Sequence, residues 1–165
     1  MSDNVYLGNP NLKKANTPIE FTEDNVIEFV RCKNDPVYFA RKYIKIVSLD
    51  EGLVPFNMYD FQEKLIDRFH KNRFNICKMP RQTGKSTTCI SYLLHYAVFN
   101  DNVNIAVLAN KASTARDLLG RLQLAYENLP SWMQQGIISW NKGSLELENG
   151  SKISANSTSS SAVRG

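Results

Sequence analysis

The tripeptide Gly84-Lys85-Ser86 lies between a short apolar segment and a long one. Residues 74–79 (FNICKM) predict a short strand, and residues 86–99 predict a helix with many apolar side chains. A turn of this kind brings flexible backbone N–H groups, a lysine charge and the positive end of a helix dipole to one point. This feature predicts an α/β core around an anion-binding turn.

The alternation of strands and helices continues after residue 99. Val103 to Ala109 is an uninterrupted apolar run, which predicts a strand covered on both faces. Residues 112–128 predict another helix, which stops near Pro130. Asn149-Gly150 separates two alternating segments and predicts a β-hairpin. Residues 73–165 therefore predict a parallel α/β sheet that ends in a hairpin.

The first 72 residues differ from the rest in their sequence pattern, because they contain helix signals but no clear strand. Residues 1–19 are rich in Asn, Pro and Lys, and we interpret them as a flexible arm. Thr22 and the Asp35-Pro36 pair are expected to start two helices, and residues 59–70 form a third amphipathic pattern. We predict a helical subdomain over residues 20–72 and a separate α/β core over residues 73–165.

Composition limits the protein class and its surroundings. The chain has 165 residues, of which 42% are hydrophobic, enough for one folded domain, and no apolar run approaches the ~20 residues of a membrane span. Three cysteines without CxxC spacing favour a reducing, cytoplasmic setting. The 20 basic and 16 acidic residues give only +4, but basic residues cluster where they can attract phosphates, at Lys64, Arg68, Lys71, Arg73, Lys78, Arg81 and Lys85.

The Gly84-Lys85-Ser86 turn matches the end of a Walker A phosphate loop. Gly84 has no Cβ to obstruct a phosphate, Lys85 offers it a compact charge, and the Ser86 hydroxyl can ligate Mg²⁺. Met79 replaces the usual first glycine of the motif. We predict nucleotide phosphates beside Arg81, Gln82, Thr83, Gly84, Lys85, Ser86 and Thr87, with Ser86 as the metal ligand.

The segment RQTGKST, with Arg81 and Gln82 inside the loop, resembles the deviant Walker A motif of the large terminase subunits of tailed phages. These ATPases pump DNA into proheads. The similarity to the T-even-like group extends in order and spacing from about Asp35 to Gly165, through the segments DPVYFARKYIKI, PFNMYDFQEKLID, LANKASTARDLL and LPSWMQQGIISWNKGSLELENGSKISANSTSSSAVRG. It implies a P-loop NTPase fold of the additional-strand class, with ATP and Mg²⁺ as cofactors.

The resemblance implies roles for four further positions. Gln62 falls where the family has a glutamine that recognises adenine, and an exposed helix glutamine is the alternative. Arg81 matches an arginine proposed to act on the γ-phosphate, although it would also suit a salt bridge. Arg164 matches an arginine implicated in sensing or trans-acting hydrolysis, so the implied catalytic set is Arg81, Lys85 and Arg164. Lys111 lies in a helicase-like segment that would touch DNA or couple to it, unless it is a solvated lysine.

The resemblance also implies partners and a location. The expected partners are double-stranded DNA, the portal protein, the small terminase subunit and further copies of the chain in a ring on the prohead. The expected location is the cytoplasm of the infected bacterium, and a nuclease domain is expected downstream.

One required element is missing from the sequence. An ATPase of this class needs an apolar strand that ends in Asp-Glu, to support the metal and orient the attacking water. No such string occurs, and in the family it follows the stretch that ends this chain. We therefore interpret the chain as the front of an ATPase domain, through truncation or an interrupted gene. The alternatives are the front half of a superfamily-two-like helicase, or a non-catalytic nucleotide- or DNA-binding module.

Overall fold

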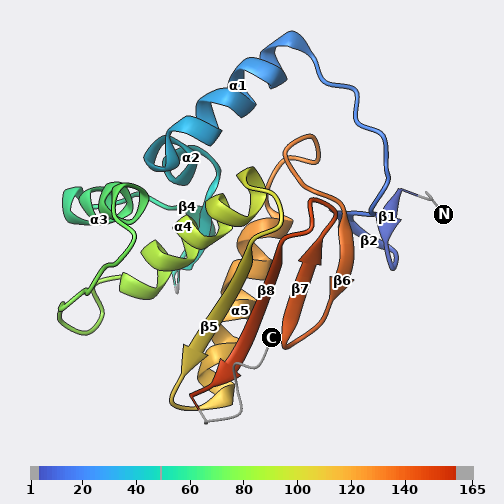
Figure 1. Ribbon diagram of the computed structural model, residues 1–165. Coiled ribbons are helices and arrows are strands. Elements are labelled where there is room, and N and C mark those ends of the chain that lie inside the picture. Colours follow the sequence, from blue (N-terminus) through green and yellow to red (C-terminus); the bar gives the residue numbers. More distant parts are fainter. Residues whose placement is uncertain (1–3, 49, 159–165) are drawn as a thin grey trace.

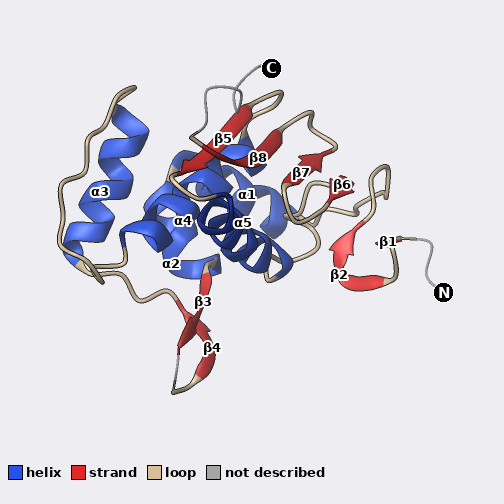
Figure 2. Ribbon diagram, turned by 90° about the horizontal axis from the view of Figure 1, so that it is seen from below, coloured by secondary structure: helices blue, strands red, loops and turns tan. Residues whose placement is uncertain are grey.

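The computed structural model describes residues 4–48 and 50–158. It is a mixed α/β structure, in which helices pack together beneath a small sheet (Figures 1 and 2). The helices are α1 (Glu23–Asn34), α2 (Pro36–Tyr43), α3 (Asp60–Lys71), α4 (Lys85–Phe99) and α5 (Ala112–Glu127). The main sheet contains β5 (Asn104–Ala109), β6 (Ile137–Trp140), β7 (Ser144–Leu147) and β8 (Lys152–Ser157). No helix in this part of the chain is long and apolar enough to cross a membrane.

The five predicted helices are confirmed, and local capping explains two of their starts. The Thr22 hydroxyl accepts a hydrogen bond from the Asn25 N–H at 3.2 Å. The Asp35 carboxylate accepts one from the Tyr38 N–H at 2.8 Å, and Pro36 occupies the first turn of α2. Such caps satisfy N–H groups that a helix start leaves free.

The main sheet has the order β5-β8-β7-β6. The predicted hairpin is confirmed, because β7 and β8 pair in antiparallel fashion and Gly150 takes a φ of 78° in the turn. The prediction of a parallel sheet is only partly correct. Only β5 and β8 run parallel, whereas β6 pairs with β7 in antiparallel fashion.

Strand β5 is covered on one face, so the prediction of cover on both faces is wrong. Burial alternates along the strand, and Asn104, Ala106 and Leu108 are exposed. Helix α5 packs against β5 and β8 from one side, and α4 packs against α5 on that same side. Among the described residues, no helix covers the opposite face (Figure 2).

The strand predicted at residues 74–79 does not form. This segment runs as a loop between α3 and α4, away from the sheet (Figure 1), with Phe74 81% and Ile76 100% exposed. A strand is stable only beside a partner that satisfies its N–H and C=O groups. The described residues offer this segment no such partner.

The N-terminal segment contains regular structure that the sequence analysis did not predict. Strands β1 (Val5–Tyr6) and β2 (Asn9–Lys13) form a hairpin, and Leu12 is buried in the core. Lys14 forms a parallel bridge with Ile137 at the outer edge of β6. Residues 4–14 are therefore packed against the sheet rather than forming an unstructured arm. The boundaries of the helical subdomain and the core stay a prediction.

A second unpredicted hairpin joins α2 to α3. It consists of β3 (Lys45–Ser48) and β4 (Gly52–Pro55), which pair in antiparallel fashion. The sequence analysis interpreted Gly52 to Pro55 only as a break. The four-residue strands are too short for a clear alternation of apolar and polar side chains.

A polar clamp joins α1 to α2. The Glu28 carboxylate accepts hydrogen bonds from the hydroxyls of Tyr38 and Tyr43, at 2.9 and 2.8 Å, and forms an ion pair with Lys42 at 2.8 Å. Burial alone would raise the pKa of Glu28, but the hydrogen bonds from Lys42, Tyr43 and Tyr38 outweigh it and lower the pKa to about 2. The clamp thus keeps its charge through the whole physiological pH range.

An aromatic cluster joins α2 to α4. The Phe39 ring is fully buried and lies 5.4 Å, between ring centroids, from both His95 and Phe99. The His95 Nε2–H donates to the Cys32 carbonyl at 2.9 Å, and His95 Nδ1 has no partner among the described residues. Burial lowers the pKa of His95 to about 4.

The buried His95 predicts an acid-sensitive fold. The folded-state pKa of His95 lies below the ordinary value of 6.5. Between these two pKa values the unfolded chain therefore binds a proton at His95 that the folded chain does not bind. The free energy of unfolding should therefore decrease as pH falls from about 6.5 to 4, by roughly 3 kcal/mol in total. Urea denaturation across this range measures the slope. His95→Phe should remove most of it, leaving the smaller part that Glu28, with its lowered pKa, contributes below about pH 5. The same substitution at the exposed His70, whose charge is only a minor cause of the low His95 pKa, should keep most of the slope.

Candidate functional site

The predicted phosphate loop leads directly into α4. Gly84 caps this helix with a φ of 74°, a left-handed conformation that favours glycine. The Gly84 carbonyl accepts hydrogen bonds from the N–H and the hydroxyl of Thr88, at 2.9 and 3.1 Å. These bonds fix the first turn of α4, whose free N–H groups and dipole suit an anion.

Residues 79–85 form a loop that is closed upon itself. The Lys85 ammonium donates to the carbonyls of Met79, at 3.2 Å, and of Pro80. The Thr83 hydroxyl also donates to the Pro80 carbonyl, at 3.1 Å. In this structure the Lys85 ammonium therefore donates its hydrogen bonds to carbonyls of the loop. A phosphate that binds to Lys85 would have to replace these carbonyl oxygens as hydrogen-bond acceptors.

Gln62 reaches the loop from α3. Its side chain is buried, its Nε2 donates to the Thr83 carbonyl at 3.1 Å, and its Oε1 accepts from the Tyr59 N–H at 2.9 Å. Both ends of the amide are thus held by protein groups. The alternative of an exposed helix glutamine is wrong, because this side chain is only 4% exposed.

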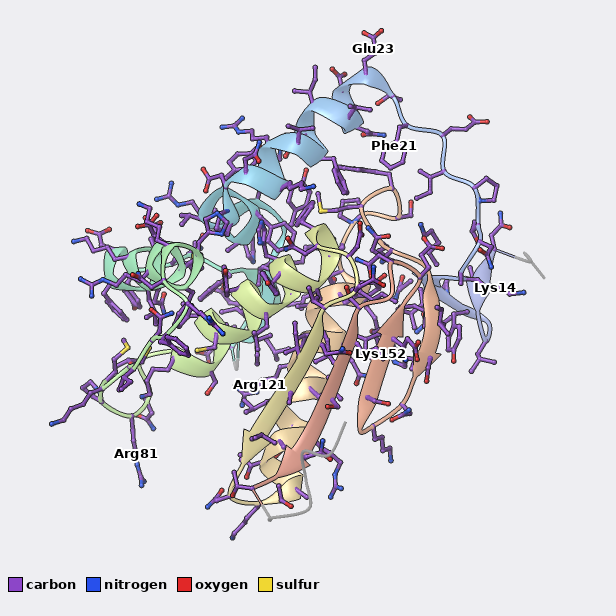
Figure 3. All side chains as sticks on the ribbon, in the orientation of Figure 1. Lys14, Phe21, Glu23, Arg81, Arg121 and Lys152 are labelled. Carbon is purple, nitrogen blue, oxygen red and sulfur yellow. The ribbon has the colours of Figure 1, made fainter. Side chains whose placement is uncertain are left out.

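The remaining loop residues face solvent to different degrees. Arg81 and Ser86 are exposed, and Arg81 extends away from the loop (Figure 3). Arg81 forms no ion pair with any described residue, which removes support for the salt-bridge alternative. Gln82 is exposed with a φ of 63°, and Thr87 is half-buried.

The two remaining predicted positions lie away from this loop. Lys111 is exposed at the N-cap of α5, just before the helix begins, which suits either a contact with DNA or a solvated lysine. Arg164 lies outside the described residues.

Residues 76–165 match the family model described as terminase large subunit, T4likevirus-type, N-terminal. This stretch starts just before the loop and covers more than half of the chain. The chain belongs to this terminase family. The family serves bacteriophage DNA packaging and is generally an ATPase. The resemblance inferred from the sequence is thus confirmed.

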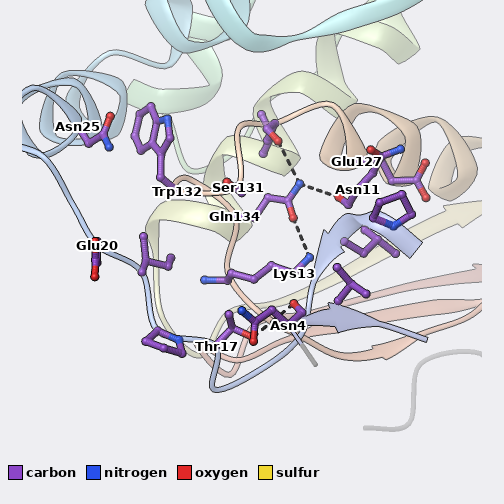
Figure 4. Close-up of a pocket in the computed structure, with 16 residues that line it drawn as sticks. Asn4, Asn11, Lys13, Thr17, Glu20, Asn25, Glu127, Ser131, Trp132 and Gln134 are labelled. Atoms are coloured by element: carbon purple, nitrogen blue, oxygen red, sulfur yellow. Dashed lines mark hydrogen bonds between the residues drawn. The ribbon is translucent and has the colours of Figure 1, made fainter. Parts of the chain in front are cut away.

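Two cavities of the structure lie away from the predicted phosphate loop of this terminase chain, whereas a smaller one, of about 330 Å³, is lined in part by Thr87. A cavity of about 610 Å³ lies between the N-terminal segment and the turn after α5, where Gln134 hydrogen-bonds to Lys13 and Asn11 (Figure 4). A second, of about 690 Å³, lies between the end of α3, α4 and the start of β5. Neither is lined by residues 80–87.

The terminase chain offers limited support for a metal ion. The Ser86 hydroxyl is exposed at the start of α4, where it would suit Mg²⁺ together with phosphate oxygens. Among the described residues, no group of three or more His, Cys, Asp or Glu side chains could hold a metal. Ser86 is thus the one predicted metal ligand, and carboxylate support would have to come from elsewhere.

The sequence analysis missed two contacts of this site in the terminase, the bond of Lys85 to carbonyls of its own loop and the bond of Gln62 to Thr83. It selected Gln62 for adenine recognition and did not foresee the bond between Gln62 and Thr83. Residues 21 positions apart carry no local signal of such a contact. The nearest signal was the glycine at position 84, because a residue without a Cβ permits close approach of another group.

Proposed function

We propose that this terminase chain binds Mg-ATP at residues 81–87 as the front of a DNA-packaging ATPase. The observation that carries the proposal is the family match over residues 76–165 together with Gly84-Lys85-Ser86 at the start of a 15-residue helix. Lys85 would exchange its carbonyl partners for β- and γ-phosphate oxygens, and Ser86 would hold Mg²⁺. The family assignment favours this function over the helicase and binding-module alternatives.

The proposal extends to the role of the complete terminase. Bound Mg²⁺ neutralises charge on the phosphates, and the exposed Arg81 is free to approach the γ-phosphate as its charge changes during transfer. Hydrolysis would drive translocation of double-stranded DNA into the prohead, in the bacterial cytoplasm. The portal protein, the small terminase subunit and further copies in a ring are the proposed partners.

Titration calorimetry with Mg-ADP tests nucleotide binding. Lys85→Ala should weaken binding by roughly ten- to a hundredfold, because a hydrogen bond to a charged group contributes about 1.5–3 kcal/mol. Lys78→Ala is the matched control, since it removes an exposed lysine from the same basic cluster but lies outside the motif. Equal losses in the two variants would indicate general electrostatic attraction rather than a phosphate loop.

A further inference from the structure

We infer that Gln62 is a positioning residue that sets the shape of the phosphate loop in addition to any contact with the base. The inference rests on the proposed function and concerns the bond from Gln62 Nε2 to the Thr83 carbonyl. This bond joins α3, which would face the nucleotide base, to the loop that would face the phosphates.

The backbone around Thr83 explains why this bond matters. Thr83 lies between two residues in left-handed conformation, Gln82 with a φ of 63° and Gly84 with a φ of 74°. Left-handed backbone is costly for a residue with a Cβ such as Gln82, so the surrounding structure must hold it. The Gln62 amide supplies such a restraint at the carbonyl between the two.

The planar peptide bond transmits this restraint to the other side of the loop. In a trans peptide the C=O of one residue and the N–H of the next point in opposite directions. Drawing the Thr83 carbonyl toward Gln62 therefore turns the Gly84 N–H away from α3. An N–H fixed in that direction is a donor for an anion at the start of α4.

The packing at Gly84 supports the same conclusion. A Cβ built on Gly84 would lie 2.4 Å from Gln62 Nε2, so the amide rests directly against this glycine. Gln62 is also anchored at its other end, where Oε1 accepts from the Tyr59 N–H at the start of α3. The side chain thus forms a rigid link between the first turn of α3 and the loop.

Inorganic tripolyphosphate separates positioning from base recognition, because it has no base. Gln62→Met removes the hydrogen-bond donor without adding charge. With Mg²⁺ present, this substitution should lower the affinity for tripolyphosphate about tenfold, because the loss of a hydrogen bond of about 1.4 kcal/mol corresponds to a factor of ten. The affinity for GDP should fall by the same factor, and the affinity for ADP by at least that factor. Gln123→Met is the matched control, because Gln123 Nε2 also donates to a backbone carbonyl, that of Asn141, from a different helix.

A second variant separates the role in the loop from the role at the helix start. Gln62→Glu keeps an acceptor for the Tyr59 N–H but can donate to Thr83 only when protonated. Its affinity for tripolyphosphate, relative to the unmodified chain at each pH, should recover as the new carboxyl becomes protonated, at a pH above the ordinary pKa of about 4.3 because position 62 is buried. Gln62→Met has neither the charge nor the donor and should show no such recovery. Loss of the negative charge alone would bring Gln62→Glu only to the affinity of Gln62→Met, so recovery beyond that level indicates the restored donor.

The outcomes distinguish the inference from the function on which it rests. If Gln62→Met binds tripolyphosphate as tightly as the unmodified chain and only ADP weakens, Gln62 recognises the base alone and the inference is wrong. If Lys85→Ala leaves tripolyphosphate binding unchanged, residues 81–87 are not the phosphate site, and both proposals fall together.

Discussion

In the presence of residues 1–165, phosphate should be released from ATP no faster than in buffer without protein, even under conditions in which the chain binds the nucleotide. Hydrolysis needs a carboxylate that orients the attacking water, and loss of such a group costs about 10²–10⁴ in rate. The candidates are poorly placed. Asp101 is exposed in a turn, Asp117 is exposed on α5, and Glu127 accepts a hydrogen bond from Asn9 at 3.3 Å.

Steady-state phosphate release measures this directly. The unmodified chain and Lys85→Ala should give the same background rate, while a terminase large subunit that includes the Asp-Glu strand should be active. Robust turnover by residues 1–165 that Lys85→Ala abolishes would show that one of the dismissed carboxylates is the base.

Phe39→Ala should lower the free energy of unfolding by about 4 kcal/mol, within the range for deletion of a buried aromatic ring. Phe39 is fully buried, and its ring contacts Tyr43 on its own helix and both His95 and Phe99 on α4. The substitution would leave a cavity where α2 packs against α4, the helix that follows the proposed phosphate loop.

Urea denaturation provides the measurement, and Phe61→Ala provides the control. Phe61 is 41% exposed on α3 and stacks on Tyr59 with ring centroids 5.6 Å apart, so its loss should cost about 1 kcal/mol or less. Equal losses at the two positions would show that the aromatic cluster around Phe39 is not the core of the fold.

The helices could be predicted from the sequence because their signals are local. The caps at Thr22 and Asp35 lie within three residues of the groups they bind, and apolar periodicity marks the buried faces. Local signals were not sufficient to decide whether residues 74–79 form a strand. Its composition favours a strand, but a strand needs a neighbour, and the described residues provide none.

The same distinction applies to the candidate site. The residues of the loop are consecutive, so the chain brings Thr83, Gly84 and Lys85 together without help from the fold. The partners of these residues were not predictable. The engagement of Lys85 with the carbonyls of its own loop depends on loop conformation, and the Gln62–Thr83 bond depends on the packing of α3 beside α4.

The two edges of the main sheet differ in whether another segment of the chain pairs with them. At β6, the bridge between Lys14 and Ile137 occupies the outer edge, and the Ala15 N–H donates to the Ile137 carbonyl at 3.3 Å. At the opposite edge, β5 has a neighbour on one side only within the described part of the chain. An unpaired edge is a template for strands of other molecules, and a partly apolar one favours aggregation. Self-association at high concentration would therefore begin at β5, beside the exposed Leu108, and a charged residue at that position would improve solubility.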